Sequence, residues 1–204
     1  MPESKTSQIL TPEAYLEWEK DNEIKHEYAD GEIFAMVGAK DAHVTVSLNL
    51  ASLLRDHVRG GPCRVYMADM KVSVDSANAY FYPDVFVTCE PKDSKSEYFK
   101  RHPTVITEVL SNSTSAFDRG KKFAMYRQLP SLQEYIIIDP NTLSVDCFRR
   151  DSTDHWVLYP FGENEIVEFN SINFTTPIET LYEDVSFSQS EAENTAGKDS
   201  RPTD

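Results

Sequence analysis

Two carboxylates stand at positions where the surrounding sequence pattern calls for apolar side chains. Asp84 lies in an aromatic and β-branched run that predicts a strand over residues 81–88. Glu108 alternates with Ile106 and Leu110 in a second predicted strand, so it shares their apolar face. A lone carboxylate on such a face is costly unless another group offsets its charge. The sequence therefore predicts a partner for Glu108.

The helix predicted over residues 117–129 supplies a candidate partner. It follows a run rich in Ser, Thr and Asn and stops before a proline. At about 100° per residue, Lys122 falls inside the apolar arc that includes Tyr126, whereas Lys121 falls at its edge. Asp118 lies one turn before Lys122. The lysine that points inward is therefore expected to be Lys122.

Two inward carboxylates and one inward lysine are what metal-assisted cleavage of a phosphodiester requires. Carboxylates bind a hard divalent cation through oxygen, and the cation polarises a phosphoryl oxygen and lowers the pKa of a bound water. A lysine beside them positions that water or neutralises charge that develops on the phosphorus. For any single charged residue, a buried pair that serves only packing is the better explanation. Three such residues on consecutive elements favour the catalytic interpretation.

Three linked motifs then resemble the Uma2 family of the PD-(D/E)xK restriction-endonuclease-like superfamily. They are Tyr-Pro-Asp-Val at 82–85, Thr-Glu-Val-Leu-Ser-Asn-Ser-Thr at 107–114, and Asp-Arg-Gly-Lys-Lys at 118–122, followed by Tyr126 and by Pro-Ser-Leu-Gln-Glu-Tyr at 130–135. The likeness extends from Thr11 to about Asp146. Leu110 stands where the lysine of the superfamily usually lies. The resemblance implies that the lysine has moved to the next helix, where Lys122 fits.

The resemblance implies a fold and a mechanism. The fold is α/β, a restriction-endonuclease-like mixed sheet flanked by helices, with an N-terminal helix and hairpin and a C-terminal β-meander. The strands of Asp84 and Glu108 are expected to be neighbours, and Asp84, Glu108 and the backbone carbonyl of Val109 to bind Mg²⁺ or Mn²⁺ beside Lys122. Without metal the clustered acids repel one another, which predicts a raised pKa for one of them. The implied substrate is DNA, and many nucleases of this kind are homodimers whose two sites face two strands.

Four residues form a second tier of candidates: His43, Asp69, Asp118 and Tyr126. His43 lies on the flank of the apolar face of a predicted helix, and in nucleases of this class the first core helix commonly borders the metal site. A lone histidine so placed is, however, more often a hydrogen-bonded core residue. Asp69 resembles another family position, although pairing with Lys71 on the solvent side explains it at least as well.

The net charge of −14 opposes binding to a polyanion. A basic patch near the site has six candidate members, although a charge run is more often a solvated face: Lys100, Arg101, His102, Arg119, Lys121 and Arg127. The charge and Leu110 together keep open a second hypothesis, a catalytically inactive nuclease fold that serves as a binding or scaffold module. Glycoside hydrolysis by paired carboxylates ranks last, because it leaves Lys122 without a role.

The rest of the chain supplies the elements around these residues. The N-terminal part is predicted to form a helix over 11–20, a hairpin around Asp30-Gly31, and a helix over 41–58 whose apolar face holds Val44, Leu48, Ala51, Leu54 and Val58. A strand over 64–74 is expected to pair with that of Asp84, and a buried strand follows over 134–139. The C-terminal part is expected to form meander strands over 145–149, 156–160 and 165–169 and a closing helix or edge segment over 174–182. One endonuclease-like domain is expected over 11–185, with a flexible segment at 1–10 and a disordered polar tail at 186–204.

Cysteine usage and hydropathy suggest a cytoplasmic protein. No apolar run approaches the roughly 18 residues of a membrane span, and the first residues lack a signal-peptide pattern. Cys63, Cys89 and Cys147 are odd in number and widely spaced, without metal-ligand spacing. They are predicted to be reduced thiols, with Cys89 and Cys147 packed in strands.

Overall fold

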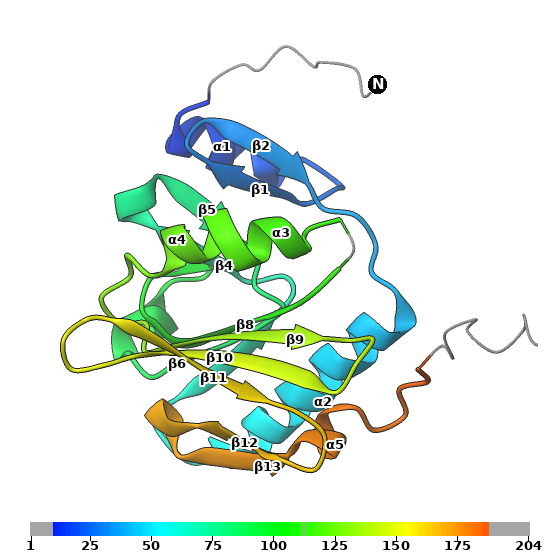
Figure 1. The fold of residues 1–204 in the computed structure, drawn as a ribbon. Helices are drawn as coiled ribbons and strands as arrows, with labels where there is room; N and C mark the ends of the chain where they lie inside the picture. Colours follow the sequence, from blue (N-terminus) through cyan, green and yellow to red (C-terminus); the bar gives the residue numbers. More distant parts are fainter. Residues whose placement is uncertain (1–9, 112, 188–204) are drawn as a thin grey trace, which may run out of the picture.

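The computed structural model describes residues 10–111 and 113–187 (Figure 1). The α-helices are α1 (Pro12–Lys20), α2 (Asp41–His57), α3 (Ser115–Phe117), α4 (Phe123–Tyr126) and α5 (Ile178–Leu181). The 3₁₀ and π-helical turns are η1 (Asp75–Ala77), η2 (Pro91–Lys95), η3 (Asp118–Lys122) and η4 (Asn170–Ile172). The strands are β1 (His26–Ala29), β2 (Glu32–Ala35), β3 (Arg64–Met67), β4 (Lys71–Val74), β5 (Ala79–Phe81), β6 (Val85–Thr88), β7 (Phe99–Lys100), β8 (Pro103–Val109), β9 (Glu134–Asp139), β10 (Ser144–Arg150), β11 (Trp156–Phe161), β12 (Ile166–Phe169) and β13 (Phe174–Pro177). The predictions for residues 1–9 and 188–204 fall outside the described residues. None of the helices described is long and apolar enough to span a bilayer.

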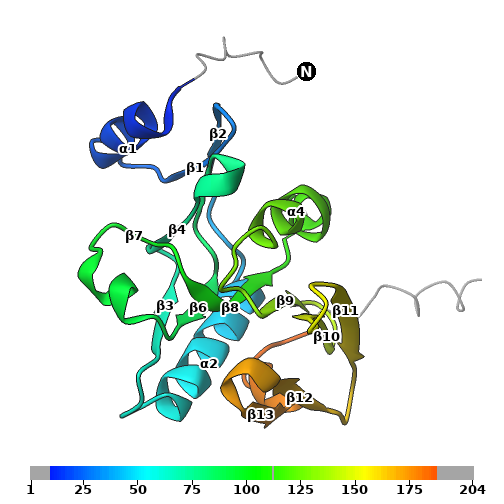
Figure 2. The same cartoon turned by 90° about the vertical axis from the view of Figure 1, so that its left-hand side faces the viewer.

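Two sheets organise most of the strands. The six-stranded sheet has the order β11-β10-β9-β8-β6-β3, in which β8 and β9 are parallel and the other neighbours are antiparallel. The five-stranded sheet has the order β2-β1-β5-β4-β7. α2 covers one face of the six-stranded sheet, and the helical segment that includes α4 covers the other (Figure 2). This mixed sheet flanked by helices confirms the predicted α/β fold.

One long hairpin belongs to both sheets. β3 and β6 pair within the six-stranded sheet, while their continuations β4 and β5 pair within the five-stranded sheet. The first strand of this hairpin passes from one sheet to the other at Ala68, whose φ is 49°. The second strand does so at Pro83, which has no N–H to donate to a ladder. The predicted strands over 64–74 and 81–88 are therefore each interrupted. Asp84 lies in the bend directly before β6.

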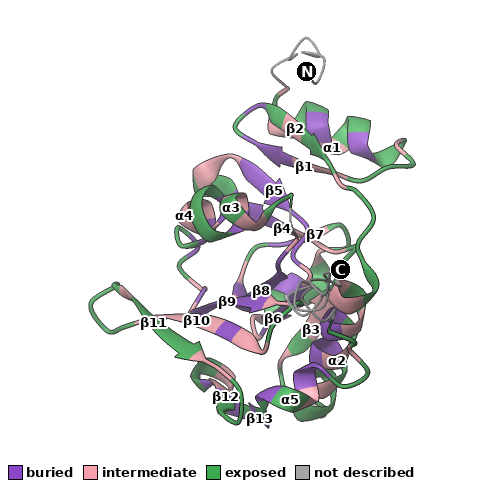
Figure 3. Cartoon of the chain, turned by 45° about the vertical axis from the view of Figure 1, so that its right-hand side comes forward, coloured by how far each residue is buried: buried purple, intermediate pink, exposed green. Residues whose placement is uncertain are grey.

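Three apolar clusters lie between the layers (Figure 3). The first lies among α2, the six-stranded sheet, β12, β13 and α5. The second lies on the other face of the six-stranded sheet, against α4, β4 and β5. The third contains Tyr15, Tyr28 and Tyr80, where α1 packs on the five-stranded sheet. Because β8 contributes Val105 to the first cluster and Ile106 to the second, both of its faces are buried.

The buried face of α2 differs from the predicted one. Val46, Leu50 and Leu54 are fully buried, whereas Val44 and Leu48 are 52% and 56% exposed. Both sets recur at helical spacing, so the helical period alone did not distinguish them. Of the five predicted positions, Ala51, Leu54 and Val58 are buried as expected. Contact with the sheet buries Val46 and Leu50, and the predicted inward positions of Val44 and Leu48 were wrong.

The C-terminal strands follow the predicted meander only in part. β10 and β11 extend the six-stranded sheet as expected. β12 leaves that sheet and pairs with β13, and the closing segment consists of β13 followed by α5. Glu134 holds η4, the turn between β12 and β13, in place. Its buried carboxylate accepts hydrogen bonds from the N–H groups of Asn170 and Ser171 at 2.9 and 3.0 Å.

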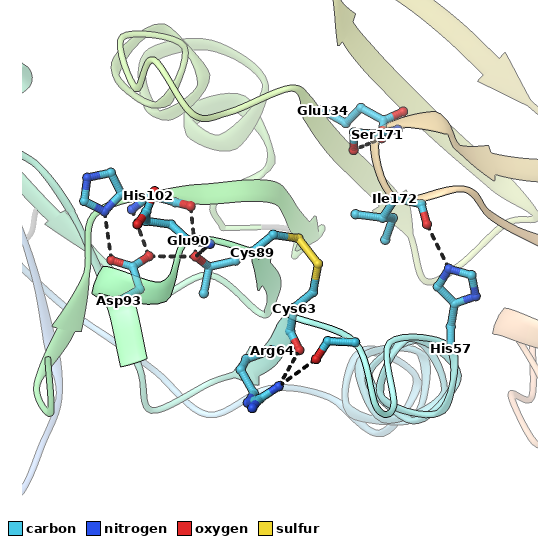
Figure 4. The surroundings of a disulfide bond; sticks show 12 residues. His57, Cys63, Arg64, Cys89, Glu90, Asp93, His102, Glu134, Ser171 and Ile172 are labelled. Carbon is cyan, nitrogen blue, oxygen red and sulfur yellow. Dashed lines mark hydrogen bonds and ion pairs between the residues drawn. A yellow bond between two sulfur atoms is a disulfide. The ribbon is translucent and has the colours of Figure 1, made fainter. Parts of the chain in front are cut away.

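The prediction of three reduced cysteines was wrong for two of them. Cys63 and Cys89 form a disulfide between the segments that flank β3 and β6 (Figure 4). The register pairs Arg64 with Thr88, so the two cysteines stand directly opposite each other one residue further along. The linear spacing conceals this proximity, because only the strand pairing brings the two segments together. Cys147 is a free, buried thiol in β10, as predicted.

The two candidate faces of α2 predict different costs for two leucine truncations on that helix. We expect Leu50→Ala to lower the free energy of unfolding by about 2–5 kcal/mol, because it leaves a cavity in the first cluster. Leu48→Ala should change it by less than about 0.5 kcal/mol, because that side chain is already half exposed. Urea unfolding of both variants measures the difference, and equal costs would refute the assigned face.

Candidate active site

Lys122 is buried within a continuous helical segment, residues 115–126. The middle of this segment, η3, is a π-helical turn between α3 and α4. Such turns alter which side chains face inward and are frequent at functional sites. Lys122 is 5% exposed, while Lys121 lies on the surface. The predicted inward orientation of Lys122 is confirmed.

Three carboxylates surround the Lys122 ammonium. Its Nζ lies 2.9 Å from Glu27 Oε1, 3.0 Å from Glu108 Oε1 and 3.7 Å from Asp118 Oδ1. It also lies 5.4 Å from the centre of the Phe81 ring. Burial lowers the pKa of Lys122, but the carboxylates of Glu108, Glu27 and Asp118 outweigh burial and raise this pKa above its usual value. Lys122 therefore stays protonated at neutral pH, where it donates hydrogen bonds and does not accept a proton.

Glu108 is held from two sides. Besides the ammonium, the Tyr126 hydroxyl donates a hydrogen bond of 3.1 Å to Glu108 Oε1. Burial raises the pKa of Glu108, and Asp84 and Asp118 raise it further, so that it lies well above the usual range although Lys122 acts to lower it. A raised pKa for one of the clustered acids was predicted, and it is confirmed at Glu108.

Asp84 lies across from Glu108 where two neighbouring strands meet. β6 pairs Val85 with Thr107 of β8, and one further step of this register brings Asp84 opposite Glu108. The Val109 N–H donates a hydrogen bond of 2.7 Å to Asp84 Oδ2. The two acids thus lie at the same end of adjacent strands, which confirms the predicted neighbourhood of their strands.

Three of the second-tier residues also lie in this cluster. His43, in the first turn of α2, places Nε2 3.3 Å from Asp84 Oδ2. Burial lowers the pKa of His43, but Asp84 and the backbone of Val109 outweigh burial, so the pKa is raised. Asp118 is buried near Lys122, and burial raises the pKa of its carboxyl. With Tyr126 on Glu108, these residues enclose the site.

Asp69 does not belong to the cluster. Its exposed carboxylate forms an ion pair with Lys25 at the bend between β3 and β4. The alternative pairing with Lys71 was also wrong, because the Lys71 ammonium is half-buried and donates a hydrogen bond of 3.0 Å to the Tyr82 hydroxyl. The left-handed backbone of Ala68 turns the chain between these strands, and the sequence pattern gave no sign of that turn.

The structure adds Glu27, which the sequence reasoning missed. Glu27 lies on β1 of the five-stranded sheet, and its side chain is 12% exposed. The available signal was its alternation with Ala29, which is fully buried in the second cluster. In a strand of four residues, this signal is too short to distinguish an inward acid from an outward one.

The expected basic patch is largely neutralised by acidic groups. Lys100 is 3% exposed, and its ammonium donates a hydrogen bond of 2.8 Å to the backbone carbonyl of Asp93. Four other members have acidic partners, in the pairs Arg101–Asp75, His102–Asp93, Arg119–Asp146 and Lys121–Glu32. These residues are therefore not a free cationic surface.

The donor set at the two acids has the chemistry of a site for a hard cation. Asp84, Glu108 and the carbonyl of Val109 supply oxygen atoms only, and Mg²⁺ is typically held by one or two carboxylates together with waters. Within residues 10–111 and 113–187, no three His, Cys, Asp or Glu side chains form a preformed metal cage. Three carboxylates nevertheless lie within 3.7 Å of the Lys122 ammonium, and Asp84, which His43 contacts, lies opposite Glu108. The residues present fit a divalent cation.

Comparisons with known proteins identify a family and a similar fold. Residues 12–179 match the Uma2 family, which is described as "Putative restriction endonuclease". Two relatives come from Synechocystis: "Uncharacterized protein slr1290" is 36% identical over 178 residues, 87% of this chain and 94% of the relative, and "Uncharacterized protein sll1609" is 36% identical over 168 residues, 81% and 95%. A "putative nuclease belonging to DUF820" from Anabaena variabilis has a similar fold, with a TM-score of 0.71 and 18% identity over 85% of this chain and 98% of that one.

The raised pKa of Glu108 predicts how the stability of the metal-free protein depends on pH. Between the ordinary value of 4.5 and the raised pKa, the folded state keeps a proton that the unfolded state has released. Stability should therefore fall as pH rises above 4.5 toward the raised pKa, and Glu108→Gln should weaken this dependence, because only the raised pKa values of Asp118 and His43 then remain. Urea unfolding across this range, with the exposed Glu32→Gln as control, measures the effect. Equal slopes in Glu108→Gln and the unsubstituted protein would contradict it.

Proposed function

The chain belongs to the Uma2 family, and from this membership and the geometry of the site we propose that it is an endonuclease that hydrolyses phosphodiester bonds in DNA with Mg²⁺ or Mn²⁺. One observation carries the proposal: the buried ammonium of Lys122 contacts Glu108, and one further step of the β6–β8 register brings Asp84 opposite Glu108. A buried pair that served only packing would need one acid for one base. Here three carboxylates lie within 3.7 Å of the Lys122 ammonium and Asp84 lies opposite Glu108, which favours a site that receives a further cation.

In this proposal Asp84, Glu108 and the carbonyl of Val109 hold the divalent ion. When bound, the ion supplies a polarised phosphoryl oxygen and a water of lowered pKa. The Val109 N–H orients the Asp84 carboxylate, and the Tyr126 hydroxyl orients that of Glu108. Both acids are therefore held in place before any ligand binds, which lowers the cost of ordering them.

Lys122 has the role of a permanent hydrogen-bond donor. Because its pKa is raised, its ammonium stays charged and does not act as a general base. We assign to it the orientation of the attacking water and the neutralisation of charge that develops on phosphate oxygens. The Leu110 position, which lacks the usual lysine, is compatible with this role, since the ammonium reaches Glu108 from η3 instead.

The second-tier residues act through these groups. His43 lies against Asp84 Oδ2 and restrains that carboxylate from the side of α2. Asp118 lies on the same helical segment as Lys122 and restrains the ammonium. We further propose that residues 11–185 form the catalytic domain and that two copies associate so that two sites face two strands. The cytoplasmic location expected from reduced cysteines loses that support, because Cys63 and Cys89 form a disulfide.

A second candidate function is a nuclease fold that binds a partner without cleaving DNA. The specific observation in its favour is charge: the net value is −14, and the expected basic patch is engaged by acids. An inactive module would still need an explanation for the excess of buried acids around Lys122. Cleavage therefore remains the better supported function.

Nicking of supercoiled plasmid DNA tests the proposal. We expect the protein to nick DNA with Mn²⁺ or Mg²⁺ and to lose activity in excess EDTA, because the metal supplies the activated water. Asp84→Asn should lower the rate at least about 100-fold, because it removes a ligand charge. Asp69→Asn is the matched control, since this neighbouring acid is exposed and paired with Lys25. Equal cutting by Asp84→Asn would overturn the assignment, and no metal-dependent cutting by the unsubstituted protein would favour the inactive module.

A further inference from the structure

We propose that Glu27 is a positioning residue that joins Lys122 to the bend bearing Asp84, so that the N-terminal hairpin forms part of the active site. Its consequence for catalysis rests on the proposed nuclease function, whereas its effect on Lys122 does not. Glu27 belongs to neither of the strands nor to the helical segment that carry the expected motif. It approaches the cluster from β1 of the five-stranded sheet.

A single oxygen atom of Glu27 makes both connections. Glu27 Oε1 lies 2.9 Å from the Lys122 ammonium and accepts a hydrogen bond of 3.1 Å from the Tyr82 N–H. Tyr82 precedes Asp84 by two residues, with Pro83 between them. The carboxylate therefore fixes the backbone just before one acid of the site while it holds the cation of the site. None of the other acids around Lys122 makes this connection among the described contacts.

Helix α1 holds the bend before Asp84 at a second point. The Tyr82 hydroxyl donates a hydrogen bond of 3.0 Å to Glu19, a buried carboxylate of α1. Glu19 also accepts a hydrogen bond of 2.8 Å from the N–H of His26, the residue before Glu27. The position of Glu27 is thus fixed by contacts on its own strand and on the helix before it.

Glu27 also determines where the ammonium rests. Lys122 is shared among three carboxylates, and Glu27 and Glu108 lie at nearly equal distances from it. If Glu27 loses its charge, the ammonium keeps only Glu108 and Asp118 as ionic partners. It should then shift toward Glu108 and occupy the oxygen that the proposed metal needs. The carboxylate of Glu27 therefore keeps Lys122 beside Glu108 without letting it replace the metal.

Two variants of the same hairpin test this inference. Glu27→Gln removes the charge at the shared oxygen, whereas Glu32→Gln removes an exposed charge that lies 3.9 Å from Lys121. The first readout is the position of the Lys122 ammonium in crystal structures of the two variants. We expect the ammonium to move away from residue 27 and toward Glu108 in Glu27→Gln, because one of its ionic partners is lost, and to keep its place in Glu32→Gln. An unchanged position of the ammonium in Glu27→Gln would overturn the inference.

The second readout is steady-state nicking with Mn²⁺. Glu27→Gln should lower kcat about 10–100-fold, in the range of residues that orient metal ligands, and leave KM for DNA within about twofold. Nicking by Glu27→Gln at the rate of Glu32→Gln would overturn the inference. If the unsubstituted protein does not nick DNA, the proposed function fails, and the position of the Lys122 ammonium alone decides the role of Glu27. If Glu27→Gln does not fold, Glu27→Asp retains the charge but shortens the side chain, and an unchanged position of the ammonium in it would likewise overturn the inference.

Discussion

The buried ammonium of Lys122 is the constraint on which the site depends. A charge removed from water is tolerated only where partners surround it, and Lys122 has three: Glu27, Glu108 and Asp118. These acids come from β1, β8 and η3, so one cation links the five-stranded sheet, the six-stranded sheet and the helical segment between them. Removal of Lys122 would leave several carboxylates without compensation in a poorly solvated place. The same contact thus orders the fold locally and assembles the chemical groups.

The cluster is not electrically balanced by Lys122 alone. Asp84 adds a further carboxylate across from Glu108, and the raised pKa of Glu108 follows from burial together with this crowding. A site of this kind is complementary to a cation in a way that the surface is not. The net charge of −14 describes the whole chain, whereas the excess of acids at Asp84 and Glu108 lies where oxygen ligands converge. The net negative charge of the chain repels a polyanion at long range, but the acids at this site are compatible with metal binding at short range.

The sequence predicted the parts of the site that depend on local periodicity. Alternation along β8 placed Glu108 on the inner face, and the helical period placed Lys122 inside the apolar arc and Lys121 at its edge. Glu27 and the Cys63–Cys89 disulfide were missed because both depend on pairing between distant segments. On α2, Val44 and Leu48 were misassigned because two sets of apolar residues fit one helical period, and only packing against the sheet distinguishes them. The bend at Asp84 likewise follows from a hairpin shared by two sheets, which no local pattern reveals.

A crystal structure of the full chain with bound Mn²⁺ tests the central claim most directly, because the anomalous signal of the metal locates it independently of any activity. We expect one anomalous peak, from a manganese ion bound by the carboxylates of Asp84 and Glu108 and by the carbonyl of Val109. The Lys122 ammonium should still lie beside Glu108. Manganese at another set of residues, or no peak at these acids at saturating concentration, would contradict the claim that this cluster is a site for a divalent cation.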